Sequence, residues 1–270
     1  MEMDKSHEKE PKSTVYGPVR SWRVGMSLGI DLLLVNSICS FRCIYCQLGR
    51  INIHTGERQV FVPTEKIISD LMAADWQAAD VITLSGSGEP TLAANLGEVI
   101  HEIKVLTGKP LVVLTNSAHL NDPQVRRELL EADKIFCKLD AADDDTLKLI
   151  DRPVEGVTVR TIVDGIKALR KEYSGYLAIQ TMLMPLNSGQ IGGLAGLLNE
   201  IKPDEVQLNT PLRAVPREWI TQSRGDHGER NYPTVRLKVI DRQEAERIEA
   251  ELRRLTGLPI ISVYDKQPGG

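Results

Sequence analysis

The sequence of 270 residues predicts an α/β fold built on a parallel β-sheet. Short aliphatic runs alternate with segments of helical spacing, which is typical of βαβ units. Runs such as VITL and LVVLTN are continuously apolar, as parallel strands covered on both faces are. Polar residues follow the ends of these runs, where α/β folds bind ligands. This periodicity leaves a partial barrel and an open, doubly wound sheet as alternatives.

The predicted elements follow one another in regular order. We predict six strands, at residues 31–36, 80–85, 110–115, 134–139, 176–184 and 205–209. Helices are predicted between them at residues 64–74 with Thr64 as N-cap, and at 92–106, 122–131, 158–171 and 190–201. A last helix at 242–255 and a short strand at 258–263 complete the fold. Residues 210–238 are rich in Pro, Gly and Arg, so we expect an irregular segment that covers the mouth of the barrel.

Composition argues for a cytoplasmic protein without a membrane segment. Residues 1–15 are charged and poor in apolar side chains, and we expect them to form a flexible tail rather than a signal peptide. No apolar run approaches the roughly 18 residues that span a bilayer. The net charge of −4 gives no bulk reason to expect a polyanionic partner.

Three of the four cysteines, Cys39, Cys43 and Cys46, lie within eight residues of one another. A disulfide framework needs spread, paired cysteines, so this cluster indicates a metal site in a reducing compartment. Three thiolates can hold three irons of a cubane and leave the fourth iron open. A zinc site normally has a fourth protein ligand, or His or a carboxylate among three, and His54 lies eight residues beyond the cluster. Cys137 stands alone and is predicted to be a buried small hydrophobe.

The CxxxCxxC spacing, with Tyr45 before the last cysteine and SGSGEP one βα unit later, resembles the radical S-adenosylmethionine (SAM) superfamily. The resemblance implies a partial (β/α)6 TIM-like barrel of the radical SAM type, with a short C-terminal extension. It also implies a [4Fe–4S] cluster on the three cysteines, which form the catalytic centre. SGSGEP resembles the superfamily's GGEP-type motif, which binds the SAM amino group. Glycines permit close backbone approach, and a carboxylate pairs with an ammonium. The residues concerned are Ser85, Gly86, Ser87, Gly88 and Glu89.

The resemblance implies further SAM contacts at later strand ends. Besides Tyr45, the predicted cofactor-binding residues are Asn116, Ser117, Lys138, Asp140, Arg152, Gln180 and Asn209. Lys138 and Asp140 have an alternative role, which is to pair with each other. Read without the resemblance, SGSGEP is equally an ordinary strand-to-helix turn.

Within the superfamily, the segments CQLGR, KLDA, DRP and VQLNTP resemble a branch grouped with the wyosine-type, tRNA-modifying synthases. This likeness covers roughly residues 16–215, and we expect a barrel over 16–210 and an extension over 211–270. The sequence lacks an upstream cysteine cluster for a second iron–sulfur centre and lacks a strongly basic surface. RNA, peptide or protein, and small-molecule substrates therefore stay open.

The implied activity is reductive cleavage of SAM to a 5′-deoxyadenosyl radical that abstracts hydrogen from a substrate. A flavodoxin or ferredoxin is the expected electron donor. Two alternatives are an activase for a glycyl-radical enzyme and an iron–sulfur redox carrier or sensor that does not cleave SAM. In the carrier, SGSGEP, Lys138 and Asp140 would be dispensable.

Two basic segments are candidates for substrate contacts. In GPVRSWRVG, Arg20 and Arg23 flank Trp22 and could grip a phosphate or a base, or the segment is a structural strap. Residues 210–238, including Arg213, carry six Lys or Arg against three acids. This bias suits an anionic substrate, whereas the plainer interpretation is a solvated loop.

Overall fold

The computed structural model describes residues 13–34, 36–220 and 232–265. Eight of its strands form one sheet in the order β1-β2-β5-β6-β7-β8-β9-β12, in which only β1 and β2 pair antiparallel. The strands of the sheet are β1 (Val15–Ser21), β2 (Gly25–Ile30), β5 (Val81–Leu84), β6 (Leu111–Thr115), β7 (Lys134–Lys138), β8 (Tyr176–Met182), β9 (Glu205–Asn209) and β12 (Ile260–Ser262).

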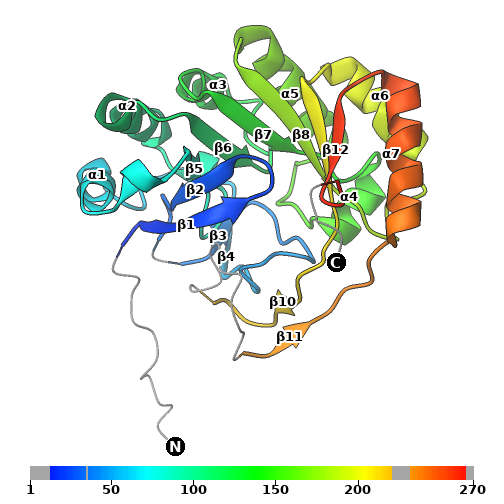
Figure 1. Cartoon of the computed structure of the whole chain (residues 1–270), viewed down its shortest axis with the longest axis horizontal. Coiled ribbons are helices and arrows are strands. Elements are labelled where there is room, and N and C mark those ends of the chain that lie inside the picture. Colours follow the sequence, from blue (N-terminus) through cyan, green and yellow to red (C-terminus); the bar gives the residue numbers. More distant parts are fainter. Residues whose placement is uncertain (1–12, 35, 221–231, 266–270) are drawn as a thin grey trace, which may run out of the picture.

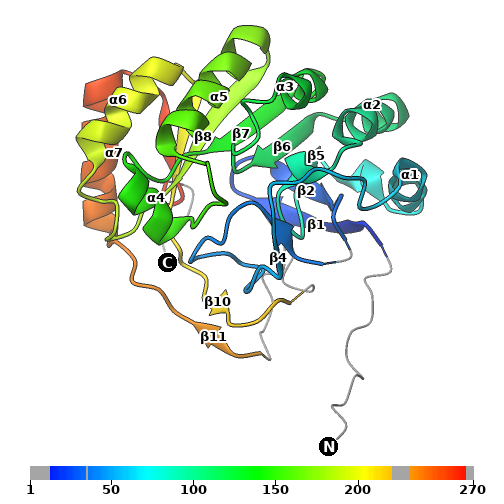
Figure 2. The same cartoon turned by 180° about the vertical axis from the view of Figure 1, so that it is seen from behind.

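The helices line the outer side of this sheet, which curls away from them (Figures 1 and 2). They are α1 (Thr64–Met72), α2 (Leu96–Thr107), α3 (Pro123–Leu129), α4 (Asp144–Ile150), α5 (Val159–Glu172), α6 (Ile191–Ile201) and α7 (Arg242–Thr256), with the short 3₁₀ turns η1 (Trp76–Ala78) and η2 (Pro90–Leu92). One face of the sheet is thus covered by helices and the other is concave. The partial-barrel prediction is confirmed, and the doubly wound alternative is excluded.

The first predicted strand was wrong. The strand β2 ends at Ile30, and the apolar residues after it form a buried loop instead. The carboxylate of Asp31 explains the turn, because its Oδ1 accepts from the backbone N–H groups of Leu33 (2.9 Å) and Leu34 (3.2 Å). A side chain that captures nearby N–H groups competes with strand pairing. Residue 35 lies outside the described residues. The five later predicted strands are confirmed within a few residues.

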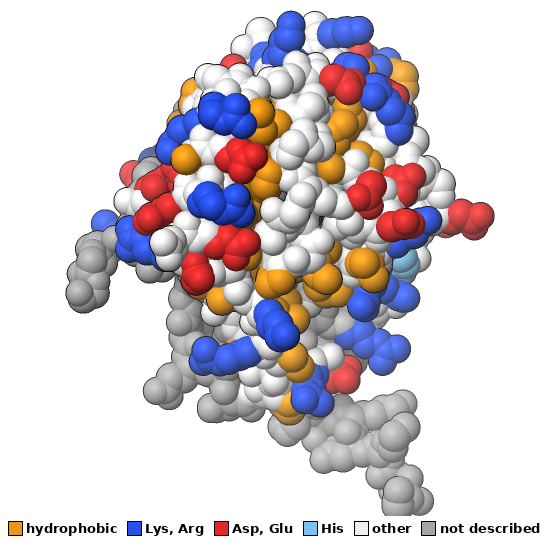
Figure 3. All heavy atoms as spheres, turned by 90° about the vertical axis from the view of Figure 1, so that its right-hand side faces the viewer, with side chains coloured by type: hydrophobic (Ala, Val, Ile, Leu, Met, Phe, Trp, Pro, Cys, Tyr) orange, Lys and Arg blue, Asp and Glu red, His pale blue; other side chains and the backbone are white. Residues whose placement is uncertain are grey.

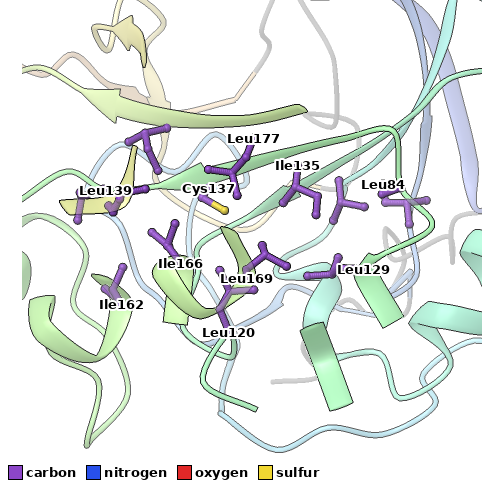
Figure 4. Close-up of a cluster of buried hydrophobic side chains, with 14 of the residues drawn as sticks. Leu84, Leu120, Leu129, Ile135, Cys137, Leu139, Ile162, Ile166, Leu169 and Leu177 are labelled. Atoms are coloured by element: carbon purple, nitrogen blue, oxygen red, sulfur yellow. The ribbon is translucent and has the colours of Figure 1, made fainter. Parts of the chain in front are cut away.

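The main core lies between the sheet and its helices (Figure 4). Cys137 on β7 is fully buried there, among side chains such as Ile135, Ile166 and Leu169, as predicted. Burial raises the pKa of the Cys137 thiol to about 12. This cysteine belongs to the hydrophobic packing and lies outside the cavity described below.

Both ends of the described chain are tied to the fold. Of the predicted tail, residues 1–12 lie outside the described residues, but Thr14 is buried and donates from N (2.8 Å) and Oγ1 (2.9 Å) to Asp70 on α1. The flexible tail therefore does not extend to Thr14. In the extension, β12 adds a parallel strand to β9 and α7 packs beside α6. The small ribbon of β10 (Val215–Pro216) and β11 (Thr234–Val235) lies below them.

The surface around α6 and α7 carries interspersed basic and acidic side chains (Figure 3). Pairs spaced four residues apart account for part of the pattern on α7, including Arg242–Glu246 and Arg247–Glu251. No helix among the described residues is long and apolar enough to cross a membrane.

Candidate active site

A cavity of about 750 Å³ occupies the concave side of the sheet. Strand ends, the β1–β2 hairpin and the segment after β9 form its wall. Most predicted site residues line it: Cys39, Cys43, Tyr45, Cys46, Ser85, Gly86, Gly88, Glu89, Asn116, Lys138, Asp140, Gln180, Asn209, Arg23 and Arg213. Three predicted residues do not line it, namely Ser87, Ser117 and Arg152.

The cysteine loop begins on the short strand β3 (Ile38–Cys39), which pairs with β4 (Ile53–His54). The Sγ of Cys39 accepts from the Phe41 N–H at 3.4 Å, and Cys46 N–H donates to the Cys43 carbonyl at 3.1 Å. Burial raises the pKa of all three thiols. Within the described residues, no three His, Cys, Asp or Glu side chains converge as a single metal ion would need.

The same loop is joined through its backbone to the SGSGEP turn. The N–H of Ile38 donates to the Ser87 carbonyl (2.8 Å), and the N–H of Glu89 donates to the Ile38 carbonyl (3.1 Å). A Cβ on Gly88 would lie 1.6 Å from that Ile38 oxygen, so only glycine fits between the two segments. Gly88 therefore lets the strand β3, which carries Cys39, lie directly against Glu89.

Asp31, which sequence reasoning missed, shapes the other half of the turn. Its Oδ2 accepts from the N–H (3.0 Å) and Oγ (2.6 Å) of Ser87, so Ser87 is turned toward Asp31 and away from the cavity. A Cβ on Gly86 would lie 2.4 Å from the Asp31 Cγ. Asp31, directly after β2, thus holds the turn at Gly86 and Ser87 in place. Nothing in its local sequence distinguishes it from an ordinary capping residue.

Glu89 is a buried carboxylate, 2% exposed, on the cavity wall. Its Oε1 accepts from Thr91 N–H (3.1 Å), Thr91 Oγ1 (2.7 Å) and Thr115 Oγ1 (2.7 Å). Its Oε2 accepts from the Asn116 N–H at 2.6 Å. All four donors are neutral, so they orient the carboxylate without cancelling its charge.

Asn116 connects this carboxylate to the cysteines. Besides its N–H contact with Glu89, its Nδ2 lies 3.6 Å from Cys39 Sγ and donates to Ser40 Oγ at 2.9 Å. The neighbouring Ser117 adopts a left-handed φ of 71° and is buried. Its Oγ donates to the Lys138 carbonyl at 3.3 Å, which places it behind the wall.

Lys138, at the end of the neighbouring strand β7, lies in a buried network of charges. Its Nζ pairs with Asp140, which is the alternative to SAM binding that the sequence left open for these two residues. It also pairs with Asp151 at 2.8 Å. It also lies 4.3 Å from the centre of the Tyr45 ring, whose hydroxyl donates to Asp140. Burial alone would lower the pKa of Lys138, but Asp140 and Asp151 raise it above its ordinary value. Asp140 Oδ1 also accepts from the Met182 N–H at 2.9 Å.

The DRP motif contributes a different residue from the predicted one. Arg152 has a left-handed φ of 48°, and its side chain is exposed outside the cavity. Asp151, directly before it, is buried beside Lys138 and Cys43, and burial raises its pKa to about 7 against the effect of Lys138. The Asp151 carbonyl also accepts from the Arg42 N–H at 2.9 Å, so the motif supports the cysteine loop.

The remaining wall combines polar strand ends with segments from both edges of the sheet. Gln180 donates to Gln207 at 2.9 Å, and Asn209 Oδ1 accepts from the Thr210 N–H at 2.9 Å. The hydroxyls of Ser85 and Tyr16 lie 2.5 Å apart. Tyr16 was missed because its whole strand, β1, was not predicted.

The segment after β9 crosses to the cysteine loop. The Ile220 N–H donates to the Leu48 carbonyl at 3.2 Å. A Cβ on Gly49 would lie 2.0 Å from the Glu218 carbonyl oxygen, so the two backbones are in close contact. Part of the segment predicted to cover the barrel mouth thus lies against the cysteine loop, and residues 221–231 lie outside the described residues.

Comparison with known proteins identifies the family. Residues 33–198 match the family described as the radical SAM superfamily. A UPF0026 protein of Synechocystis sp. is 47% identical over 251 residues, which cover 91% of this chain and 94% of that protein.

Solved structures share the fold at low sequence identity. SuiB of Streptococcus suis bound to S-adenosylmethionine superposes with a TM-score of 0.59 and 17% identity, over 84% of this chain and 48% of that one. SuiB bound to its precursor peptide SuiA superposes with a TM-score of 0.61 and 16% identity, over 87% of this chain and 48% of that one. Archaeal TYW1 superposes with a TM-score of 0.54 and 15% identity, over 85% of this chain and 72% of that one. The chain thus spans about half the length of SuiB.

Proposed function

The chain belongs to the radical SAM superfamily and to the UPF0026 proteins, and on that premise we propose that Cys39, Cys43 and Cys46 hold its [4Fe–4S] cluster beside a SAM site built on Glu89. One observation carries the proposal. Three thiols and a buried carboxylate with only neutral partners line the same cavity, and Gly88 joins their backbones.

The donor set fits the cluster. Thiolates are the usual ligands of iron–sulfur clusters, and three of them leave one of four irons open to another ligand. When bound, the cluster supplies the electron that cleaves SAM to methionine and a 5′-deoxyadenosyl radical, which takes hydrogen from the substrate. The protein's own contribution is to bind, orient and shield the reactants.

The wall residues have distinct roles in this proposal. Glu89 pairs with the SAM ammonium, since its charge is not cancelled by its four donors. The turn at Gly86 and Gly88 brings the backbone close to the methionyl group. Asn116 fixes Glu89 relative to Cys39. Ser85, Gln180 and Asn209 offer polar groups to the rest of SAM.

We assign the Lys138 network a supporting role. Both carboxylates near Lys138 are already paired with it, and its ammonium packs over Tyr45. This network holds Tyr45, and with it the cysteine loop, against β7 and β8. Ser87, Ser117 and Arg152 lie off the cavity wall, so we leave them out of the SAM-binding set.

Radical SAM enzymes need an electron donor, and we propose an acidic protein of the flavodoxin or ferredoxin type. Arg42, Arg50 and Arg152 are exposed on or beside the cysteine loop. Basic residues around a buried redox centre favour encounter with an acidic partner. We expect Arg42→Glu to slow reduction by such a donor while leaving reduction by dithionite unchanged, with Arg127→Glu on α3 as the control.

The decisive assay is anaerobic reconstitution with iron and sulfide, followed by dithionite and SAM. We expect the wild type to release 5′-deoxyadenosine and each of Cys39→Ala, Cys43→Ala and Cys46→Ala to lose the cluster absorbance. Cys137→Ala is the matched control and should retain both, because Cys137 lies in the core. A fully loaded, reducible wild-type protein that releases no 5′-deoxyadenosine would instead be a redox carrier or sensor.

A further inference from the structure

Three of the described arginines line the cavity, and two of them, Arg23 and Arg213, reach it from opposite edges of the sheet. Arg23 lies in the turn between β1 and β2, and β1 is one edge strand. Arg213 lies in the segment after β9, next to β12 at the other edge. Both side chains line the cavity that contains the cysteines and Glu89. The curl of the sheet therefore brings together residues that are 190 positions apart in sequence.

The surroundings of the Arg23 guanidinium favour the binding of an anion. Its Nε is buried and has no hydrogen-bond partner among the described residues. Its guanidinium lies 4.6 Å from the centre of the Trp22 ring, which holds it flat. Burial first, and then the charge of Arg213, lower the pKa of Arg23 to about 10. An anion bound beside both guanidiniums would offset this repulsion.

The described wall offers Arg23 no carboxylate of its own. Its acids are Glu89 and Asp140. Asp140 is taken by Lys138 and Tyr45, and Glu89 is held by neutral donors on β6 and η2. Neither of these carboxylates is paired with Arg23, so an anionic ligand can supply its partner.

We propose that Arg23 and Arg213 form an oxyanion site for the substrate, which deepens the proposed function by naming the substrate as an anion with a phosphate or carboxylate group. The planar guanidinium fork matches both oxyanions and can donate two parallel hydrogen bonds. Trp22 supplies a flat apolar surface beside the charge. The site orients the substrate by its charged end, at a part of the wall formed by the hairpin and the segment after β9.

The test measures anion binding directly, without requiring turnover. Reconstituted protein is titrated with inorganic phosphate or with acetate against chloride at equal ionic strength, with and without SAM, and the thermal unfolding midpoint is followed. A ligand that binds the folded state raises this midpoint. Arg23→Gln and Arg213→Gln are compared with Arg127→Gln, an exposed arginine on α3. Arg23→Lys keeps the charge and serves if Arg23→Gln does not fold.

We expect the wild type and Arg127→Gln to be stabilised by at least one of the two oxyanions. The apparent dissociation constant should rise roughly tenfold or more in each cavity variant. A response to phosphate alone supports a phosphorylated substrate, and a response to acetate supports a carboxylate. No stabilisation beyond chloride, or an unchanged response in the cavity variants, overturns the proposal. Release of 5′-deoxyadenosine tests the proposed function separately, so the two failures are distinguishable.

Discussion

Two walls of the cavity hold buried acids in different ways. At the ends of β5 and β6, Glu89 is surrounded by four neutral donors. At the ends of β7 and β8, Asp140 shares the ammonium of Lys138 with Asp151. The first arrangement leaves the carboxylate without a charged partner at the cavity wall, and the second pairs its acids with a buried ammonium. Burial of an acid therefore does not identify a ligand site, whereas the charge of its partners does.

The largest expected effect tests the Lys138 wall. Lys138→Met leaves Asp140 and Asp151 without their cation, and removing one partner of a buried ion pair costs about 3–5 kcal/mol of the free energy of unfolding. Chemical denaturation measures this loss. Lys104→Met is the control, because its pair with Asp133 is more exposed and should be worth about 0–1 kcal/mol. Equal losses in both variants would show that the network is not a structural support.

The next effect tests the Glu89 wall and should appear in ligand binding. Glu89→Gln removes the charge at nearly constant shape, so we expect the dissociation constant for SAM to rise roughly 10- to 100-fold. The iron content should stay unchanged, since Glu89 touches no cysteine directly. Glu131→Gln, exposed at the surface, is the control. Unaltered SAM affinity would remove Glu89 from the site.

A third variant acts on the link between the cysteines and Glu89. Gly88→Ala places a Cβ against the Ile38 carbonyl, and such overpacking costs about 1–3 kcal/mol. Both cluster loading and SAM binding should weaken together. Gly192→Ala on α6 has open space around the new Cβ and should be neutral or stabilising by about 0.4–1 kcal/mol. If only one of the two ligands were affected, the link would not be shared.

The smallest effect concerns Asp70, an acid with both charged and neutral partners. Burial alone would raise its pKa, but Lys66 and Thr14 lower it below the ordinary value. A lowered pKa stabilises the folded state at pH values above the unfolded-state pKa of about 3.9. This stabilisation is lost as the pH falls through the folded-state pKa. Asp70→Asn should therefore lower stability by about 0.5–1 kcal/mol at pH 7 and by less in acid. A difference that does not change with pH would contradict this origin.

The sequence predicted what local patterns encode. Aliphatic runs located five of the six barrel strands, and the CxxxCxxC and SGSGEP motifs located Cys39 and Glu89 on one cavity. Asp31 and Asp151 were missed, because their roles depend on hydrogen bonds and ion pairs to residues far away in the chain. The first strand was misplaced for the same reason, since the leucines after Asp31 are apolar enough for a strand but Asp31 accepts from the N–H groups of Leu33 and Leu34.

The contact between the segment after β9 and the cysteine loop has a thermodynamic consequence. Ile220 and Glu218 lie against Leu48 and Gly49 of that loop, and Arg213 belongs to the same segment. If the proposed cluster orders this loop, the contact should extend that order to the proposed substrate side of the cavity. By linkage, the factor by which the cluster strengthens substrate binding equals the factor by which substrate strengthens retention of the cluster. Substrate should accordingly slow the loss of iron to a chelator.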